Sequence, residues 1–128
     1  MILLLDTHTV LWFLWDDPHL GPAAKALIVD PANRKLVSLA SCWEIAIKAS
    51  IGKIQLGESA RTFLAREIAQ NNFDLLPITL DHATAVETLP FHHRDPFDRL
   101  IVAQTQIERI PLISVDPIFD AYGVTRLW

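Results

Sequence analysis

The sequence predicts an α/β fold of three layers, in which helices cover both faces of a central parallel sheet. The first indication is the continuous apolar run at residues 2–5, which is typical of a strand buried on both faces. The second is the alternation of short apolar runs with segments of helical periodicity, which favours parallel strands joined by helical crossovers. Right-handed crossovers place the carboxyl ends of such strands at one edge of the sheet.

Glycine and proline residues set most boundaries between the predicted elements. Gly21-Pro22 begins the second helix and Asp30-Pro31 ends it. Gly52 is placed to stop the third helix, and Pro90 to break the fifth. The expected strands are residues 2–5, 35–39, 73–78, 112–115 and 124–127, and the expected helices are 8–15, 22–29, 41–50, 58–70, 80–89 and 99–108. In the last of these helices, the residues spaced to face one way are Leu100, Ala103, Gln104 and Ile107.

Size and composition indicate one domain with a well-filled core. The chain has 128 residues, of which 51% are hydrophobic. Its apolar runs are too short for a transmembrane helix, and neither a basic leader nor a signal cleavage site is visible, so we expect a cytoplasmic protein with no membrane association. The single cysteine, Cys42, excludes an internal disulfide and a cysteine-based zinc site.

Four acidic residues lie where apolar runs stop or helices begin. They are Asp6, Glu44, Asp98 and Asp116. Ligands of open α/β sheets bind along this edge, where gathered carboxylates repel one another unless a divalent cation neutralises them. Hard oxygen ligands of this kind suit Mg²⁺ or Mn²⁺. The pattern therefore predicts a metal-dependent enzyme that transfers a phosphoryl group to water.

The net charge of −4 differs from the basic charge that is usual for proteins that bind nucleic acid. The four candidate ligands carry all of this excess, however, and a bound cation would reverse the local field. The charge therefore does not exclude a polynucleotide substrate.

Each of the four acids also has a purely structural interpretation. Ser41 and Glu44 have the spacing of a capping box at a helix start, and Asp95 with Asp98 fits a capped helix that begins at Pro96. Asp6 and Asp116 precede helical segments in the same way.

Taken together, the acids favour the metal site, because serine, threonine or asparagine would cap as well. Packing four acids together without a cation would raise their pKa values and cost stability. Asp81 has no strand directly before it, and we interpret it as a surface cap.

Five segments in this order resemble the PIN-domain family, and most closely its toxin branch, the VapC ribonucleases of prokaryotic toxin–antitoxin pairs. The segments are Leu5-Asp6-Thr7-His8, Ser41-Cys42-Trp43-Glu44-Ile45-Ala46-Ile47-Lys48, Gly52-Lys53-Ile54, His93-Arg94-Asp95-Pro96-Phe97-Asp98-Arg99-Leu100 and Ser114-Val115-Asp116. The resemblance implies a single PIN domain over residues 1–128 and the strand order 3-2-1-4-5. It also implies Mg²⁺- or Mn²⁺-dependent cleavage of RNA, neutralisation by a cognate antitoxin, and a homodimer within that complex.

The resemblance carries the family's acidic quartet onto Asp6, Glu44, Asp98 and Asp116 as catalytic and metal-binding residues. Asp6 and Asp98 are the first choice for direct ligands. Asp98 is preferred to Asp95 because the family's third acid leads directly into the Leu-Ile-x-Ala helix, which leaves Asp95 an assisting role at the cap.

Several polar residues near the acids are candidates for supporting roles. Thr7 and Ser41 could orient the carboxylates or act as ordinary caps. Ser114 stands where the family often has threonine, and its hydroxyl can still bond a carboxylate. Lys48 is spaced to form an ion pair with Glu44 on the helix surface.

Basic residues near Asp98 are candidates for the substrate. His93 could meet the substrate phosphate or affect the pH dependence. Arg94 and Arg99 could bind RNA phosphates, or could be ordinary solvated charges.

The aromatic residues Trp12, Phe13, Trp15 and Trp43 are numerous for so small a domain. The first three cannot all point inward from one short helix, so we expect a groove or rim that receives an antitoxin segment. Base stacking is the alternative, and for Trp43 core packing is the favoured interpretation.

Two other classes of function remain open from the sequence alone. A catalytically idle PIN-like binding module would use the acids only as caps. A phosphotransfer domain fits poorly. A response-regulator receiver would need two adjacent acids early in the chain and a lysine after the late strand, and an Asp-x-Asp phosphatase would need a second acid where this chain has His8.

Overall fold

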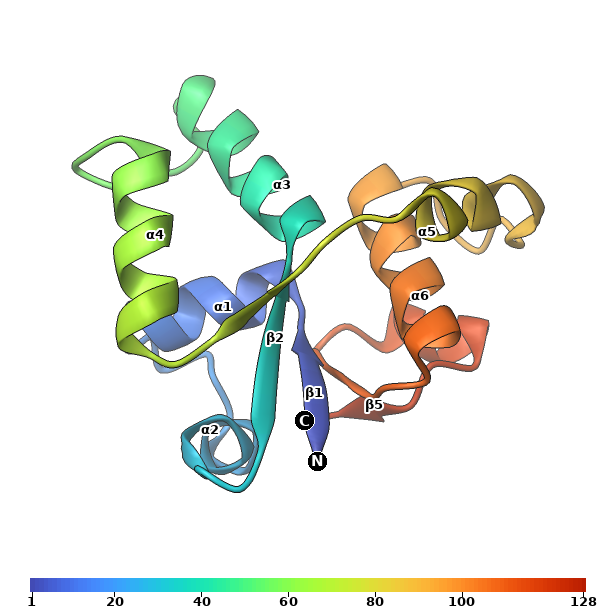
Figure 1. The fold of residues 1–128 in the computed structure, drawn as a ribbon, viewed down its shortest axis with the longest axis horizontal. Helices are drawn as coiled ribbons and strands as arrows, with labels where there is room; N and C mark the ends of the chain where they lie inside the picture. The colour runs from blue at the N-terminus through green and yellow to red at the C-terminus, as the bar shows by residue number, and fades with distance from the viewer.

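The computed structural model describes residues 1–128 and contains one five-stranded sheet between two layers of helices (Figure 1). All strand pairs are parallel and the order is β3-β2-β1-β4-β5. The strands are β1 (Ile2–Leu5), β2 (Arg34–Ser38), β3 (Asp74–Leu76), β4 (Leu112–Ile113) and β5 (Arg126–Leu127). The predicted fold class and the strand order implied by the family resemblance are confirmed.

All the predicted helices are present. They are α1 (Thr7–Leu14), α2 (Pro22–Val29), α3 (Leu39–Ser50), α4 (Ala60–Gln70), α5 (Leu80–Ala85) and α6 (Pro96–Glu108). Two 3₁₀ segments were not predicted as such, namely η1 (Val86–Thr88), which replaces the end of the fifth helix, and η2 (Pro117–Tyr122). None of the helices combines the length and the apolar composition that crossing a membrane requires.

The start of α3 corrects one sequence interpretation. Ser38 caps this helix by accepting a hydrogen bond from the N–H of Ala40 at 3.0 Å. Ser41 and Glu44 therefore lie inside the helix, and the capping box predicted for them is wrong. Because the helix begins earlier, both residues sit on its buried face.

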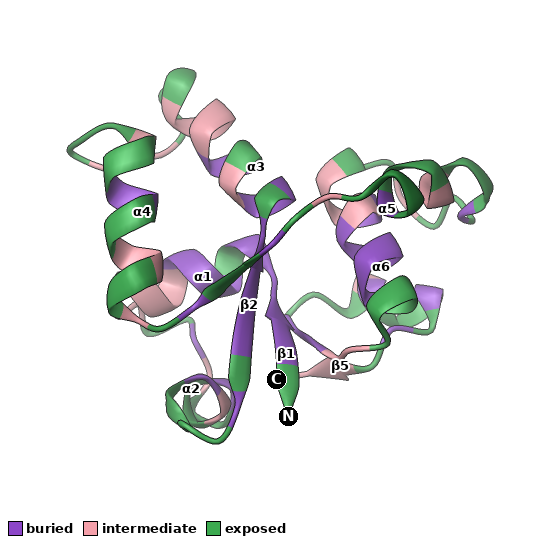
Figure 2. Cartoon of the chain, in the orientation of Figure 1, coloured by how far each residue is buried: buried purple, intermediate pink, exposed green.

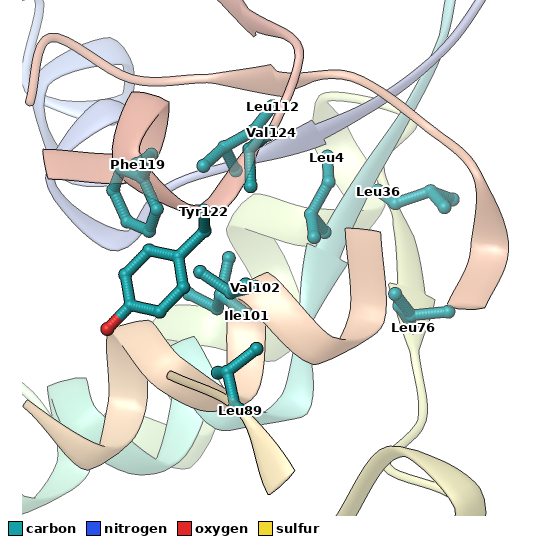
Figure 3. Packing of buried hydrophobic residues seen from close by; sticks show 10 residues of the cluster. All are labelled: Leu4, Leu36, Leu76, Leu89, Ile101, Val102, Leu112, Phe119, Tyr122 and Val124. Atoms are coloured by element: carbon teal, nitrogen blue, oxygen red, sulfur yellow. The ribbon is translucent and has the colours of Figure 1, made fainter. Parts of the chain in front are cut away.

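Side chains alternate across β1 and feed two separate apolar clusters. Leu4 packs on one face with Ile101 and Val102 of α6 and with η2 (Figure 3). Leu3 and Leu5 point to the other face, where α1 and α2 cover them. Figure 2 shows that the inner strands β1 and β2 are buried over most of their length. A parallel sheet covered on both faces leaves only its edges for ligands.

The buried face of α6 differs in part from the prediction. Ala103 and Gln104 are fully buried as expected, but Ile107 is 40% exposed and Leu100 is only partly covered. Ile101 and Val102 are fully buried instead, because α6 lies between the sheet and the α5–η1 segment and η2 and so is covered over a wide arc.

Truncating a buried and an exposed isoleucine of α6 tests this assignment. Ile101→Ala should lower the free energy of unfolding by about 2–4 kcal/mol, because it leaves a cavity in the core. The matched variant Ile107→Ala should cost less than about 1 kcal/mol, because that side chain is partly solvated. Urea unfolding followed by circular dichroism measures both, and equal losses would contradict the observed face.

Candidate metal centre at the carboxyl edge of the sheet

The four acids come from four elements that meet at the carboxyl edge of the sheet. Asp6 follows β1 and Asp116 lies shortly after the neighbouring strand β4. Glu44 lies in α3 and Asp98 in the first turn of α6, and both helices begin at this edge (Figure 1). Asp6 and Glu44 are buried, Asp98 is half-buried and Asp116 is exposed.

The pKa of Asp98 reports how closely the acids gather. Burial of the carboxyl and then the negative charges of Asp6, Asp95, Glu44 and Asp116 raise this pKa to about 8. Burial also raises the pKa of Asp6, although hydrogen bonds from Ser114 and from the N–H of Thr7 oppose that rise. Burial is the larger cause of this rise, and the contributions of four neighbouring acids show that these carboxylates lie near one another at this edge.

Both carboxylate oxygens of Asp6 accept hydrogen bonds from the protein. The N–H of Thr7 donates to Oδ1 at 2.8 Å, so Asp6 caps α1, and the hydroxyl of Ser114 donates to Oδ2 at 2.8 Å. The hydroxyl oxygen of Ser114 in turn accepts from the N–H of Asp116 at 3.1 Å. Ser114 therefore links the acids that follow β1 and β4.

Thr7 and Ser41 bond each other rather than the acids. The Thr7 hydroxyl donates to Ser41 Oγ at 2.8 Å, and both side chains are buried. The expected hydroxyl bonds to carboxylates are therefore not present; only the backbone of Thr7 reaches Asp6. This pair ties the start of α1 to α3 and so holds the segments that carry Asp6 and Glu44.

Glu44 has one paired and one unpaired oxygen. Oε2 forms the predicted ion pair with Lys48, with 2.8 Å between Nζ and the oxygen. Oε1 is buried and accepts no hydrogen bond. Leaving a buried carboxylate oxygen without a donor costs free energy, and a cation or a bound water would relieve that cost.

The donor set fits a hydrated divalent cation. No group of three Asp, Glu, His or Cys side chains is arranged to hold one ion directly. Magnesium needs no such cage, because it keeps several waters and binds through one or two carboxylates together with substrate phosphates. Asp6 and Asp98 could hold such an ion, with Glu44 Oε1 available to bond its water shell.

The family of the chain follows from a comparison with known families. The model of the PIN domain matches residues 3–124. The chain belongs to the PIN-domain family. PIN domains are generally nucleases that use divalent metals.

Solved structures with the same fold include three assemblies of two components. VapBC2 from Rickettsia felis, bound to a promoter DNA fragment, matches with a TM-score of 0.74 and 15% identity over 99% of this chain and 98% of that chain. A toxin–antitoxin complex from Klebsiella pneumoniae matches with a TM-score of 0.62 and 21% identity over 98% of this chain and 95% of that chain. FitAcB from Neisseria gonorrhoeae matches with a TM-score of 0.67 and 18% identity over 100% of this chain and 97% of that chain. At these identities the likeness establishes the fold. Comparison with curated proteins gives no match.

His93 of this PIN domain, which the sequence offered as a contact for the substrate phosphate, lies against Asp98. Its Nε2 lies 3.2 Å from Asp98 Oδ2, and its Nδ1 lies 2.8 Å from the hydroxyl of Tyr122. Tyr122 was not among the predicted site residues, because it lies in η2, far along the chain and outside any motif. Only the folded arrangement reveals the contact.

Arg99 is not the solvated charge that the sequence allowed, and its buried guanidinium does not face solvent, as an RNA contact would require. Its guanidinium is buried against the ring of Phe91, at 3.9 Å from the ring centroid, and it donates to the carbonyls of Val86, Leu89 and Pro90. These bonds tie the segment before the site to α6. Arg94 is exposed and stays a candidate for the substrate.

Asp95 caps α6, as the sequence indicated. Its Oδ1 accepts from the N–H groups of Phe97 and Asp98 at 2.9 and 3.1 Å. The cap holds the turn of α6 that carries Asp98, and the charge of Asp95 adds to the repulsion felt there.

Trp43 is not a core residue, contrary to the favoured interpretation. It is 60% exposed and packs against Phe97, with 5.5 Å between ring centroids at an interplanar angle of 76°. Trp43 and Phe97 each directly precede an acid of the site, so this pair of an exposed and a partly buried ring borders it. Trp12 and Phe13 lie on α1 and are partly buried, whereas Trp15, which follows the helix as its C-cap, is 43% exposed; this agrees with the expectation that the three cannot all point inward.

Removing one acid should change the pH dependence of stability without metal. The folded pKa of Asp98 is raised, so its stabilising contribution is complete below about pH 4 and is lost as the pH rises through about 8. In EDTA at pH 8, Asp98→Asn should therefore raise the free energy of unfolding by about 1–3 kcal/mol, after allowance for solvent screening. Urea unfolding between pH 5 and pH 8.5, at roughly half-unit steps, measures the difference. Asp81→Asn, at an exposed position of α5, is the matched control. If the free energy of unfolding of Asp98→Asn changed with pH as it does in the wild type, the raised pKa would be contradicted.

Proposed function

We propose that this PIN domain is a Mg²⁺- or Mn²⁺-dependent endoribonuclease and the toxin of a VapBC-type toxin–antitoxin pair. The observation that carries the proposal is the gathering of Asp6, Glu44 and Asp98 at one sheet edge, where burial and then repulsion between the acids raise the pKa of Asp98. Family membership supports a nuclease. The solved structures with this fold come from toxin–antitoxin assemblies, which supports the pairing with an antitoxin.

The residues of the site divide into ligands and supports. Asp6 and Asp98 would hold the ion, and Glu44 and Asp116 would complete the negative surroundings. A bound divalent cation would supply an activated water and neutralise charge on the scissile phosphate. Ser114 and the N–H of Thr7 keep the Asp6 carboxylate in one orientation.

Glu44 is suited to bind and orient a water molecule. Lys48 compensates the charge at Oε2, while Oε1 is buried and has no protein donor. An oxygen in this state is a strong hydrogen-bond acceptor in a region of low dielectric. Glu44 can thus accept a proton from a water that attacks the phosphorus.

An apolar groove offers a place for an antitoxin segment. It has a volume of about 540 Å³ and lies between α3, α4 and the edge strand β3. Leu39 and Leu75 lie on it and are exposed in the isolated chain. An amphipathic helix or an added strand would cover such a surface. The homodimer implied by the family resemblance stays a prediction.

Cleavage of RNA tests the enzyme directly. A fluorescent single-stranded RNA should be cut by the purified chain with Mg²⁺, and EDTA should abolish the cutting. Asp6→Asn should lower the rate at least about 100-fold, because it removes a ligand of the ion. Asp81→Asn, which removes an exposed acid away from the site, should cut at the wild-type rate. Cutting that survives EDTA or Asp6→Asn would exclude this mechanism and indicate a contaminating nuclease or another site.

The toxin assignment has a separate test in living cells. Induced expression of the wild-type chain in a bacterial host should arrest growth, because unchecked RNA cleavage stops translation. Asp6→Asn, expressed to the same level on an immunoblot, should permit growth. Arrest by both proteins would show that toxicity does not come from the acidic site.

A further inference from the structure

A polar network on the far side of Asp98 is not used by the proposed chemistry. At its centre is the hydroxyl of Tyr122, whose ring packs in the core beside α6 while the oxygen points away from Leu112 and Val124 (Figure 3). Three groups approach this oxygen: His93 Nδ1 at 2.8 Å, the N–H of His93 at 3.3 Å and Nη1 of Arg99 at 3.3 Å. Tyr122 is 8% exposed, and the side chains of His93 and Asp98 are 20% and 18% exposed, so most of the network is buried.

The hydrogen inventory of these groups determines the direction of each bond. A backbone N–H and a guanidinium can only donate, so they occupy the acceptor positions of the phenol oxygen. The single hydroxyl hydrogen of Tyr122 is then directed to His93 Nδ1, which must accept it. The opposite arrangement would give the oxygen three donors and leave its own hydrogen unpaired in the interior.

The tautomer of His93 follows from this direction. A neutral imidazole that accepts at Nδ1 carries its hydrogen on Nε2. Nε2 lies 3.2 Å from Asp98 Oδ2 and therefore donates to it. Asp98 Oδ1 receives no hydrogen bond from the protein and so is the oxygen of this carboxylate that is left for a cation.

We propose that Tyr122 is a positioning residue for Asp98, acting through His93. The inference rests on the proposed metal site, since it identifies which oxygen of Asp98 is anchored and which is presented to the cation. The core holds the ring of Tyr122, and the carbonyl bonds of Arg99 hold the segment that leads to His93. The orientation of a candidate ligand is thereby set from the interior. Partners of this kind fix the orientation of metal ligands in other sites.

The first test reads the tautomer and needs neither metal nor RNA. In ¹⁵N-histidine-labelled wild-type protein in EDTA, at a pH where His93 is neutral, two-bond ¹H–¹⁵N spectra should place its hydrogen on Nε2. The His93→Gln spectrum assigns the signals. A hydrogen on Nδ1 would overturn the proposal.

The second test is a double-mutant cycle on Mg²⁺ binding, measured as the rise in melting temperature with Mg²⁺ concentration. Tyr122→Phe, which removes only one oxygen, should weaken apparent Mg²⁺ affinity about tenfold. His93→Ala should weaken it to a similar or greater extent, and the double variant should bind no more weakly than His93→Ala. Losses that add would show that Tyr122 acts separately and would overturn the proposal, as would unchanged affinity in Tyr122→Phe.

Two further variants separate positioning from general damage. His93→Gln keeps a donor near the place of Nε2 and should recover part of the affinity lost in His93→Ala. Phe119→Leu removes core volume from the same 3₁₀ segment, η2, without touching the network, and should lower the melting temperature while leaving Mg²⁺ affinity unchanged. If Phe119→Leu weakened Mg²⁺ binding as much as Tyr122→Phe, the loss of affinity would come from disturbed core packing, and the proposal would be overturned. A protein that binds Mg²⁺ in this manner but cuts no RNA would contradict the proposed function alone.

Discussion

Burial of carboxylates beside one another at the carboxyl edge of the sheet is the constraint on which the site of this domain depends. The parallel topology brings β1 and β4 together, and Asp6 and Asp116 follow them. Burial then makes the charges costly, which is why the pKa of Asp98 rises to about 8 without metal. The feature that destabilises the site without metal is therefore the same one that would favour a bound cation under the proposed function.

Hydrogen bonds divide the oxygens of the site into anchored and available ones. Asp6 has a donor on each oxygen, Glu44 has Lys48 on one oxygen only, and Asp98 has His93 on one only. Anchoring one oxygen of a carboxylate keeps its direction without using its full capacity to accept. The unpaired oxygens of Glu44 and Asp98 thus remain for a cation and its waters.

Capping and metal binding are not exclusive alternatives for these acids. Asp6 caps α1 through one oxygen and is also a candidate ligand, and Asp116 caps η2. A helix start directs N–H groups toward an acid and offsets part of its charge, so a cap is a favourable place to keep a carboxylate buried. This explains why local sequence patterns supported both interpretations equally well.

The sequence by itself determined the layers of the fold, the limits of most elements and the acids at the sheet edge, because apolar periodicity, turn residues and caps act over a few neighbouring positions. Of the partners of those acids it indicated only the near ones, such as Lys48 for Glu44, and left the distant ones undecided. Tertiary structure alone placed Arg99 in the interior, exposed Trp43, moved the start of α3 to Leu39 and brought Tyr122 to His93. Those outcomes depend on distances between segments far apart in the chain, and such distances are set by how the packed layers meet rather than by any local preference.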